Sequence, residues 1–246
     1  MSDDAVFAPG FVERPWWWEA APPAPSPARL PERADVLVVG GGIAGLSTAI
    51  ELGRAGTKAL VIDREAIGWG ASSRNGGALS GAGALGRAKT NLHEAVEARL
   101  LAEMVDEAEA SFEEFEALLQ REGIDCAYRR CGRFVGAHAP KALDALRRRA
   151  DMLNASGRDT AEVLDRARVG EELATDRYHG GLVITRAGGL HPARYVQGLA
   201  EAARRHGATL ASGVSFEGWS REGGVFRART SAGEVEARAL MVATNG

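Results

Sequence analysis

Cysteine is scarce in this sequence, which has two among 246 residues, Cys126 and Cys131. A zinc site needs further cysteine or histidine ligands close by, and the segment between these two cysteines offers none. We therefore interpret both residues as ordinary thiols in a strand, as is usual in a cytoplasmic protein, and we expect no metal site.

An excess of positive charge is also absent. The sequence has 30 Lys and Arg against 33 Asp and Glu, a formal net charge of −3, so a nucleic-acid partner is not expected. No apolar run reaches the length of about 18 residues that a membrane-spanning helix needs, and the N-terminus lacks the basic and apolar regions of a secretion signal. We expect a soluble, cytoplasmic protein without a membrane span.

Proline and glycine are plentiful but concentrated. Seven of the nine prolines lie within the first 31 residues, which predicts an extended arm over residues 1–33. The arm contains Trp16, Trp17 and Trp18. Because three adjacent indoles in water would form a costly apolar patch, we expect them to pack on the body of the protein or on a partner subunit. Stacking on a ligand is the alternative.

After the arm, hydrophobic patterning predicts alternating strands and helices, which is typical of an α/β protein. The predicted strands cover residues 34–39, 58–63, 128–138, 181–184, 208–214, 218–229 and 235–244. The predicted helices cover residues 43–55, 92–119, 141–156 and 192–206. In the second of these helices, Met104, Phe112 and Phe115 belong to an apolar stripe that is expected to face a core.

The first predicted strand and helix enclose Gly40-Gly-Gly-Ile-Ala-Gly45, which has the spacing G-x-G-x-x-G. Gly40 permits a tight turn, Gly42 lets the backbone approach a pyrophosphate, and Gly45 lets the helix pack closely on the strand. The pyrophosphate would lie at the helix N-terminus, where unpaired N–H groups and the helix dipole favour an anion. This position between a strand and a helix makes the motif a prediction of dinucleotide binding.

An acidic residue supports the same interpretation. Asp63 ends the second predicted strand, eighteen residues after Gly45, where a carboxylate can accept hydrogen bonds from the adenosine ribose hydroxyls. Its negative charge disfavours a 2′-phosphate, so NADP is the least favoured dinucleotide. FAD and NAD remain as alternatives at this point.

A second glycine-rich segment carries a resemblance to a known family. The sequence Gly68-Trp-Gly-Ala-Ser-Ser-Arg-Asn-Gly-Gly77 follows the second predicted strand. Together with the fingerprint before it, this segment resembles the FAD-dependent amine and amino-acid oxidases, which include D-amino-acid oxidase, glycine oxidase, sarcosine oxidase and γ-glutamylputrescine oxidase. The resemblance favours FAD over NAD, because an NAD dehydrogenase has no use for such a loop.

The resemblance implies roles for the loop and for the chain end. Ser72 and Ser73 would offer donors to phosphate, and residues 74–76 would lie near the flavin ring. Residues 243–244 end a strand similar to the one that returns beside the first strand and turns under the pyrophosphate, and Val214 corresponds to the position that meets the adenine. The full set of residues expected to bind the cofactor is Gly40, Gly42, Ile43, Ala44, Gly45, Asp63, Arg64, Ala71, Ser72, Ser73, Arg74, Asn75, Gly76, Gly77, Val214, Ala243 and Thr244.

The implied fold is α/β, with a Rossmann-like FAD-binding domain of the GR2 flavoprotein type and an incomplete antiparallel-sheet substrate domain. Residues 34–90 would form the FAD-binding βαβ unit and flavin loop, 91–185 a helical part with the start of the substrate domain, and 186–246 the return to the FAD-binding domain. Family members continue well beyond such a point. We therefore expect an N-terminal fragment, either a truncated product or one part of a split enzyme, lacking the C-terminal remainder.

The activity implied by the resemblance is oxidation of the C–N bond of a small amine or amino acid. The substrate gives a hydride equivalent to flavin N5, the imine hydrolyses, and O2 or another acceptor takes up the electrons. A catalytically silent flavin-binding or interaction subunit, which needs a partner chain, is the alternative; an NAD-dependent dehydrogenase is disfavoured by the loop. An exposed sheet edge would favour association into a homo-oligomer.

Candidate catalytic side chains are few. Arg74 is the one candidate for a positive charge near the flavin ring, and pairing with a backbone carbonyl is an equal alternative. His191 precedes Pro192 at a helix start and is interpreted as a cap or packing residue. No residue is assigned as a general base. The loop from Gly68 to Gly77 lacks His and Cys, so FAD is expected to be bound noncovalently.

Overall fold

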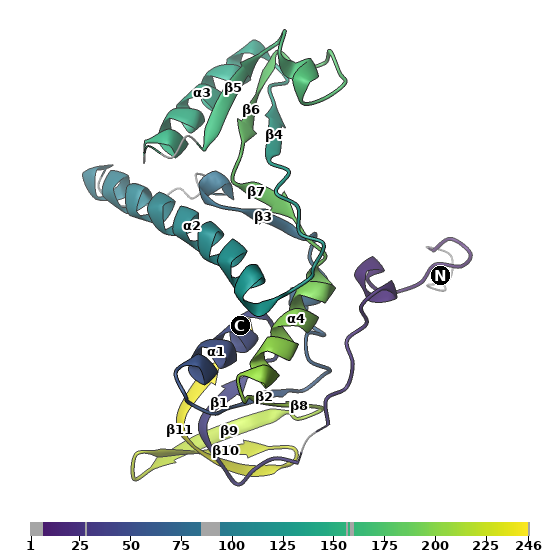
Figure 1. Ribbon diagram of the computed structural model, residues 1–246, viewed down its shortest axis with the longest axis vertical. Helices are drawn as coiled ribbons and strands as arrows, with labels where there is room; N and C mark the ends of the chain where they lie inside the picture. Colours follow the sequence, from purple (N-terminus) through teal and green to yellow (C-terminus); the bar gives the residue numbers. More distant parts are fainter. Residues whose placement is uncertain (1–6, 28, 85–93, 156, 158–159, 246) are drawn as a thin grey trace. The chain divides into compact units, whose positions relative to one another are not determined.

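The computed structural model describes residues 7–27, 29–84, 94–155, 157 and 160–245. The chain divides into two compact units, which we call unit 1 (Met1–Gly76 and His191–Gly246) and unit 2 (Gly77–Leu190) (Figure 1). The boundaries between the units fall after Gly76 and after Leu190, whereas the sequence predicts divisions after residues 90 and 185.

Unit 1 is built on a six-stranded sheet. Its strands are β1 (Arg33–Val39), β2 (Ala59–Asp63), β8 (Thr209–Ser212), β9 (Phe216–Glu222), β10 (Val225–Thr230) and β11 (Gly233–Val242). They lie in the order β8-β2-β1-β11-β10-β9. The four strands β8, β2, β1 and β11 run parallel, and β10 and β9 add an antiparallel edge. The expected return of the last strand beside the first is thereby confirmed.

Two helices make the crossovers between these parallel strands. Helix α1 (Ile43–Arg54) joins β1 to β2, and α4 (Pro192–Arg205) leads into β8. The two helices lie close together, since a Cβ built on Gly53 would overlap the backbone of His206. All of unit 2 is inserted between β2 and α4, so the second βαβ connection is completed by a helix that begins 129 residues after β2 ends.

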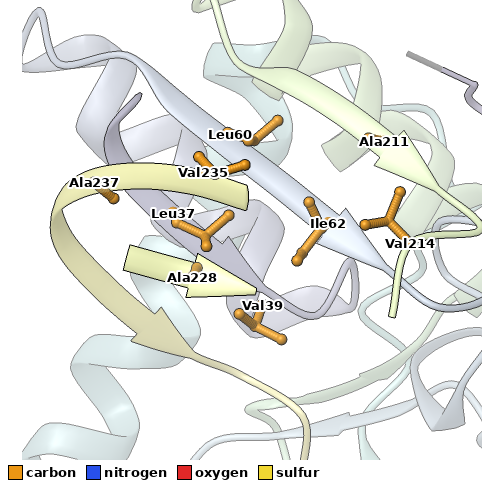
Figure 2. Close-up of a cluster of buried hydrophobic side chains, with 9 residues drawn as sticks. All are labelled: Leu37, Val39, Leu60, Ile62, Ala211, Val214, Ala228, Val235 and Ala237. Carbon is orange, nitrogen blue, oxygen red and sulfur yellow. The ribbon is translucent and has the colours of Figure 1, made fainter. Parts of the chain in front are cut away.

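The apolar core of unit 1 joins both parts of its sheet. Parallel strands buried on both faces are expected to be continuously apolar, and residues 36–39 of β1 and 59–62 of β2 have this pattern. Figure 2 shows the side chains of these strands gathered with small residues from β8, β10 and β11. The buried cluster consists of Leu37, Val39, Leu60, Ile62, Ala211, Val214, Ala228, Val235 and Ala237.

Unit 2 is a helical and antiparallel unit. It contains the helices α2 (Glu94–Glu122) and α3 (Pro140–Asn154), the short helices η4 (Ala82–Ala84) and η5 (Val169–Glu171), and the strands β3 (Ala78–Ser80), β4 (Arg133–Gly136), β5 (Ala161–Asp165), β6 (Gly180–Ile184) and β7 (Ala187–Gly189). The strands form an antiparallel sheet of order β4-β6-β5 and a separate β3-β7 pair. Val105, Leu153 and Leu182 lie in its buried core.

Several predicted elements require correction. Residues 218–229 do not form one strand, because Gly223 and Gly224 adopt φ of 57° and 87° and make the turn between β9 and β10. Cys126 and Cys131 precede β4 and are not in a strand, while Met104 is 50% exposed because it lies on the outer face of α2. Phe112 is buried as predicted. The predicted helix start at residues 92–93 lies outside the described residues.

Patterning missed the strands β3, β5 and β7. Each is three to five residues long, and β7 is composed of small residues. Such short segments have too few side chains to show alternation.

Candidate functional site

Two glycines of the fingerprint are required by close backbone contacts. Gly40 has φ of 110°, and a Cβ on it would overlap the carbonyl of Ala243 at the end of β11. A Cβ on Gly45 would overlap the carbonyl oxygen of Gly40. These positions therefore let the first turn of α1 pack against the β1 turn, and let both lie under the end of β11.

The N-terminus of α1 has no capping side chain from its own N-cap residue. Gly42 is its N-cap residue, with extended backbone (φ −88°, ψ −170°) and no side-chain cap. The Ile43 N–H donates to the Ser72 hydroxyl oxygen at 3.1 Å, and a Cβ on Gly42 would lie 2.7 Å from that oxygen. Ala44 is exposed in the same turn. A helix N-terminus with small residues and a nearby hydroxyl is a suitable site for an anion.

Asp63 lies at the end of β2, and its carboxylate is fixed from two sides. Oδ2 accepts from the Gly41 N–H at 2.8 Å, and Oδ1 accepts from the Glu65 N–H at 2.9 Å. Each carboxylate oxygen can accept a second hydrogen bond, so both can still serve ribose hydroxyls. Arg64, the next residue, is exposed. The glycine turn therefore positions the acid that sequence spacing pointed to.

The chain end and Val214 lie beside these elements. The Ala243 N–H donates to the carbonyl of Val39 at 2.8 Å, which continues the β1–β11 pairing into the turn at Thr244. The Val214 N–H donates to the backbone carbonyl of Asp63 at 2.9 Å. Residues more than 150 positions apart in sequence are thus brought to one edge of the sheet, at the carboxyl ends of β1, β2 and β11.

The flavin loop, which we define as residues 68–76, contains two serines whose hydroxyls make different contacts. Ala71, Ser72 and Ser73 form the short helix η3 (Ala71–Ser73). Ser73 is buried, and its hydroxyl donates to the Gly68 carbonyl at 2.6 Å while accepting from Trp18 Nε1 at 2.9 Å. Because the Ser73 hydroxyl already donates to one protein group and accepts from another, the expectation that it donates to phosphate is corrected. Ser72 is the hydroxyl that lies at the helix N-terminus.

The remaining residues of the loop are held by local contacts. Arg74 Nε donates to the carbonyl of Trp69 at 2.7 Å, which is the backbone pairing that the sequence left open. Asn75 Nδ2 donates to the carbonyls of Ala71 and Ser72 at 3.2 and 2.9 Å. Gly76 is exposed, and Gly77 is the first residue of unit 2. A role for the Arg74 charge near a flavin ring stays a prediction.

The aromatic arm packs on this loop, which confirms the anchoring interpretation for two of its three indoles. Trp17 and Trp18 lie in the short helix η2 (Trp16–Glu19) and donate hydrogen bonds to loop residues. Trp16 is 73% exposed, so it is not buried on the body of the protein, and its packing on a partner subunit stays a prediction. The sequence patterns do not predict the contact between the arm and the loop. They also do not single out Gly41, the backbone partner of Asp63. The run of indoles was the available signal for the arm.

His191 is the N-cap of α4, as expected. Its Nδ1 accepts from the Arg194 N–H at 3.2 Å. Partial burial, and then the nearby Arg194 charge, lower the pKa of His191 below its ordinary value, so the neutral imidazole that accepts this bond is favoured. Within the described ranges no group of three His, Cys, Asp or Glu side chains could hold a metal ion. No described helix is long and apolar enough to cross a bilayer.

The arrangement fits a dinucleotide. Glycines let the β1 turn and the α1 N-terminus pack closely on their neighbours, the Ser72 hydroxyl lies at that N-terminus, where a pyrophosphate would bind, and the Asp63 carboxylate lies at the neighbouring strand end for a ribose. Parallel strands with this turn between β1 and α1 are the Rossmann-like arrangement. Fold and site together define a dinucleotide-binding protein.

Comparison with known proteins defines the family. Residues 35–246 match the family described as FAD dependent oxidoreductase, and the chain belongs to it. The chain is 34% identical over 214 residues to gamma-glutamylputrescine oxidoreductase of Escherichia coli strain K12, which covers 86% of this chain and 49% of that protein. It is 31% identical over 250 residues to the probable oxidoreductase OrdL of Rhizobium meliloti strain 1021, covering 100% of this chain and 57% of that protein.

Solved structures agree on the fold. Glycine oxidase from Geobacillus kaustophilus has a TM-score of 0.75 and 22% identity, covering 87% of this chain and 55% of that one. L-amino acid deaminase from Proteus vulgaris has a TM-score of 0.72 and 24% identity, covering 89% of this chain and 49% of that one. The chain spans about half the length of the curated relatives it matches. FAD is the cofactor of the family, so the preference for FAD over NAD is confirmed.

Proposed function

We propose that this chain forms the FAD-binding part of an oxidoreductase that oxidises the C–N bond of a small amine or amino acid. The observation that carries the proposal is the junction of the α1 N-terminus, Ser72 and Asp63 at one edge of the sheet. Each of these groups suits one part of FAD, namely the pyrophosphate or the adenosine ribose. Binding is proposed to be noncovalent, since the flavin loop contains neither His nor Cys.

The residues of this chain bind and orient the cofactor. The Ser72 hydroxyl and the first N–H groups of α1 hold phosphate oxygens, the Asp63 carboxylate accepts from the ribose, and the backbone at Val214 meets the adenine. When bound, FAD supplies the redox chemistry by taking up a hydride equivalent at N5 and passing the electrons to O2 or another acceptor. Among the described residues we assign none as a general base.

The substrate class is proposed from the relatives. Those named for glycine, L-proline, L-amino acids and gamma-glutamylputrescine act on compounds that carry an amine nitrogen. A small amine or amino acid is therefore the proposed substrate. A flavin-binding subunit without activity of its own is the second candidate.

The test is the visible absorption spectrum of the 246-residue chain after incubation with FAD and removal of free flavin by desalting. We expect a retained flavin band with vibronic structure, and no retention of NAD in a parallel sample. A colourless protein would contradict the proposal that this chain forms the cofactor site. If flavin is retained, reduction of the band by a panel of amines under anaerobic conditions separates an enzyme from a silent subunit.

A further inference from the structure

The N-terminal arm makes a buried hydrogen bond to the flavin loop. Trp18 is 7% exposed, and its Nε1 donates to the Ser73 hydroxyl, which in turn donates to the Gly68 carbonyl. This relay joins the arm to both ends of the turn that contains η3. Because Ser73 is buried, loss of the indole N–H would leave its hydroxyl with an unfilled acceptor position.

Two further contacts bind the rest of the loop to indoles. Trp17 Nε1 donates to the Asn75 carbonyl at 2.8 Å. The Arg74 guanidinium lies 4.5 Å from the ring centroid of Trp18 and 4.7 Å from that of Trp69, and these two rings lie 4.6 Å from each other, so Arg74 packs against a pair of contacting indoles. Three consecutive loop residues are therefore each held by an aromatic side chain.

The arm is anchored independently of the loop. The carbonyl of Pro22 accepts from Gln197 on α4 at 3.0 Å. Ser26 exchanges backbone and side-chain hydrogen bonds with Ser212 at the end of β8, and its hydroxyl accepts from Arg204 at 2.8 Å. Trp17 also meets the His191 ring edge-on, with centroids 4.9 Å apart. The arm that carries the indoles is thus fixed to α4 and to the end of β8, independently of the loop.

Much of the flavin loop is exposed to solvent. Gly70 and Gly76 are open to solvent, and Arg74 and Asn75 are exposed. Yet Ser72, between them, must stand at the N-terminus of α1 for its hydroxyl to meet a phosphate. We propose that Trp17 and Trp18 are positioning residues, an indole clasp that holds the flavin loop in its folded conformation and so raises the affinity for FAD. This inference rests on the proposed function, and its physical basis is that an ordered loop loses less entropy on binding.

The test compares Trp17→Phe/Trp18→Phe with Trp16→Phe, which changes the neighbouring exposed indole. Phenylalanine keeps an aromatic ring and removes the N–H donor. In the flavin-free chain, we expect the double variant to show faster hydrogen exchange at the Ser73 and Arg74 amides, which bond to Gly70 and Ala71. With FAD, we expect a Kd about tenfold higher and a weaker vibronic structure, while Trp16→Phe matches the wild type.

A thermodynamic cycle separates positioning from general stability. Trp18→Phe in a Ser73→Ala background should raise the Kd much less than in the wild type, since the hydrogen bond is already gone. A purely structural role would lower the melting temperature of the flavin-free chain without changing the Kd of its folded form.

The outcomes separate the clasp from the proposed function. Unchanged exchange of the loop amides in the double variant overturns the clasp, and faster exchange with an unchanged Kd overturns its link to FAD. Failure of the wild type to take up FAD contradicts the proposed function and the link to affinity, while hydrogen exchange still decides whether the indoles order the loop.

Discussion

Unit 1 and unit 2 each enclose carboxylates, but they satisfy them with different partners. In unit 1 both oxygens of Asp63 accept from backbone N–H groups, at Gly41 and Glu65. In unit 2 Glu109 is fully buried, accepts from the Ala82 N–H at 2.8 Å, and lies 2.9 Å from Arg186 Nε. A carboxylate held by backbone keeps its charge available to a ligand, whereas one neutralised by arginine stabilises the framework.

The difference also shows in what surrounds each group. Around Asp63 the neighbouring turn is made of glycines, which bring the Gly41 N–H to 2.8 Å from the carboxylate. Around Glu109 the contacts connect α2 with η4 and with Arg186, between β6 and β7, and Glu113 adds a second carboxylate 2.7 Å from that arginine. The polar groups around Asp63 in unit 1 therefore form a site, whereas the cluster around Glu109 in unit 2 holds helices and strands together.

The largest expected effect comes from adding a side chain to the close-packed glycine turn. Gly45→Val places a side chain on the Gly40 carbonyl, so the free energy of unfolding should fall by more than about 4 kcal/mol and FAD binding should be lost. Gly170→Ala in unit 2 is the control, because a Cβ there meets no atom within 4 Å. Denaturant unfolding and FAD titration measure both quantities. An FAD affinity equal to that of the wild type in Gly45→Val would contradict the assignment of the cofactor site to this turn of unit 1.

Removing the cation beside Glu109 tests the framework role. Arg186→Met leaves the Glu109 charge buried without its arginine and should lower the free energy of unfolding by about 3–5 kcal/mol. Arg168→Met, which breaks exposed pairs with Glu162 and Glu171, should have little effect. We expect the folded Arg186→Met protein to keep the FAD affinity of the wild type. A large change in FAD affinity, measured where both proteins are folded to the same extent, would show that the Glu109 cluster also supports the FAD site.

Neutralising Asp63 tests the site itself. Asp63→Ala removes a charge-assisted acceptor of the ribose and should weaken FAD binding by about 1.5–3 kcal/mol, or roughly tenfold to a hundredfold in Kd. Asp63→Asn retains one acceptor oxygen for a backbone N–H and should lose less. Fluorescence titration of FAD with each variant measures the Kd. An unchanged Kd in Asp63→Ala would remove the ribose assignment.

The smallest effect concerns pH and the α4 cap. Burial and the Arg194 charge lower the pKa of His191 in the folded chain, so the unfolded chain binds the proton more readily. The stability contributed by neutral His191 should be complete above about pH 6.5 and lost as the pH falls below that value. The loss should be about 0.5–1 kcal/mol, the value of a helix cap. In His191→Asn, a cap that does not titrate, melting curves from pH 7.5 to 5 should lose this component.

Local features explain why so much of unit 1 could be predicted. Gly40, Gly42 and Gly45 act within six residues on one turn, and Asp63 follows at the end of the next strand, so their roles depend on short-range geometry. Unit 2 has no comparable fingerprint. Its strands β3, β5 and β7 form by pairing with distant partners, as Ala78 pairs with Gly189, and single-segment patterning carries no trace of such pairs.

The sequence by itself determined the glycine turn, the acid at the end of β2, the apolar strands of unit 1 and the family to which these belong. Only the tertiary structure shows that Trp18 donates a hydrogen bond to the Ser73 hydroxyl, that Arg74 packs against two contacting indoles, and that unit 2 interrupts the second βαβ connection. The physical reason is the range of the contacts. A turn or a strand follows from neighbouring residues, whereas a hydrogen bond between residues 55 positions apart exists only after the chain has brought them together.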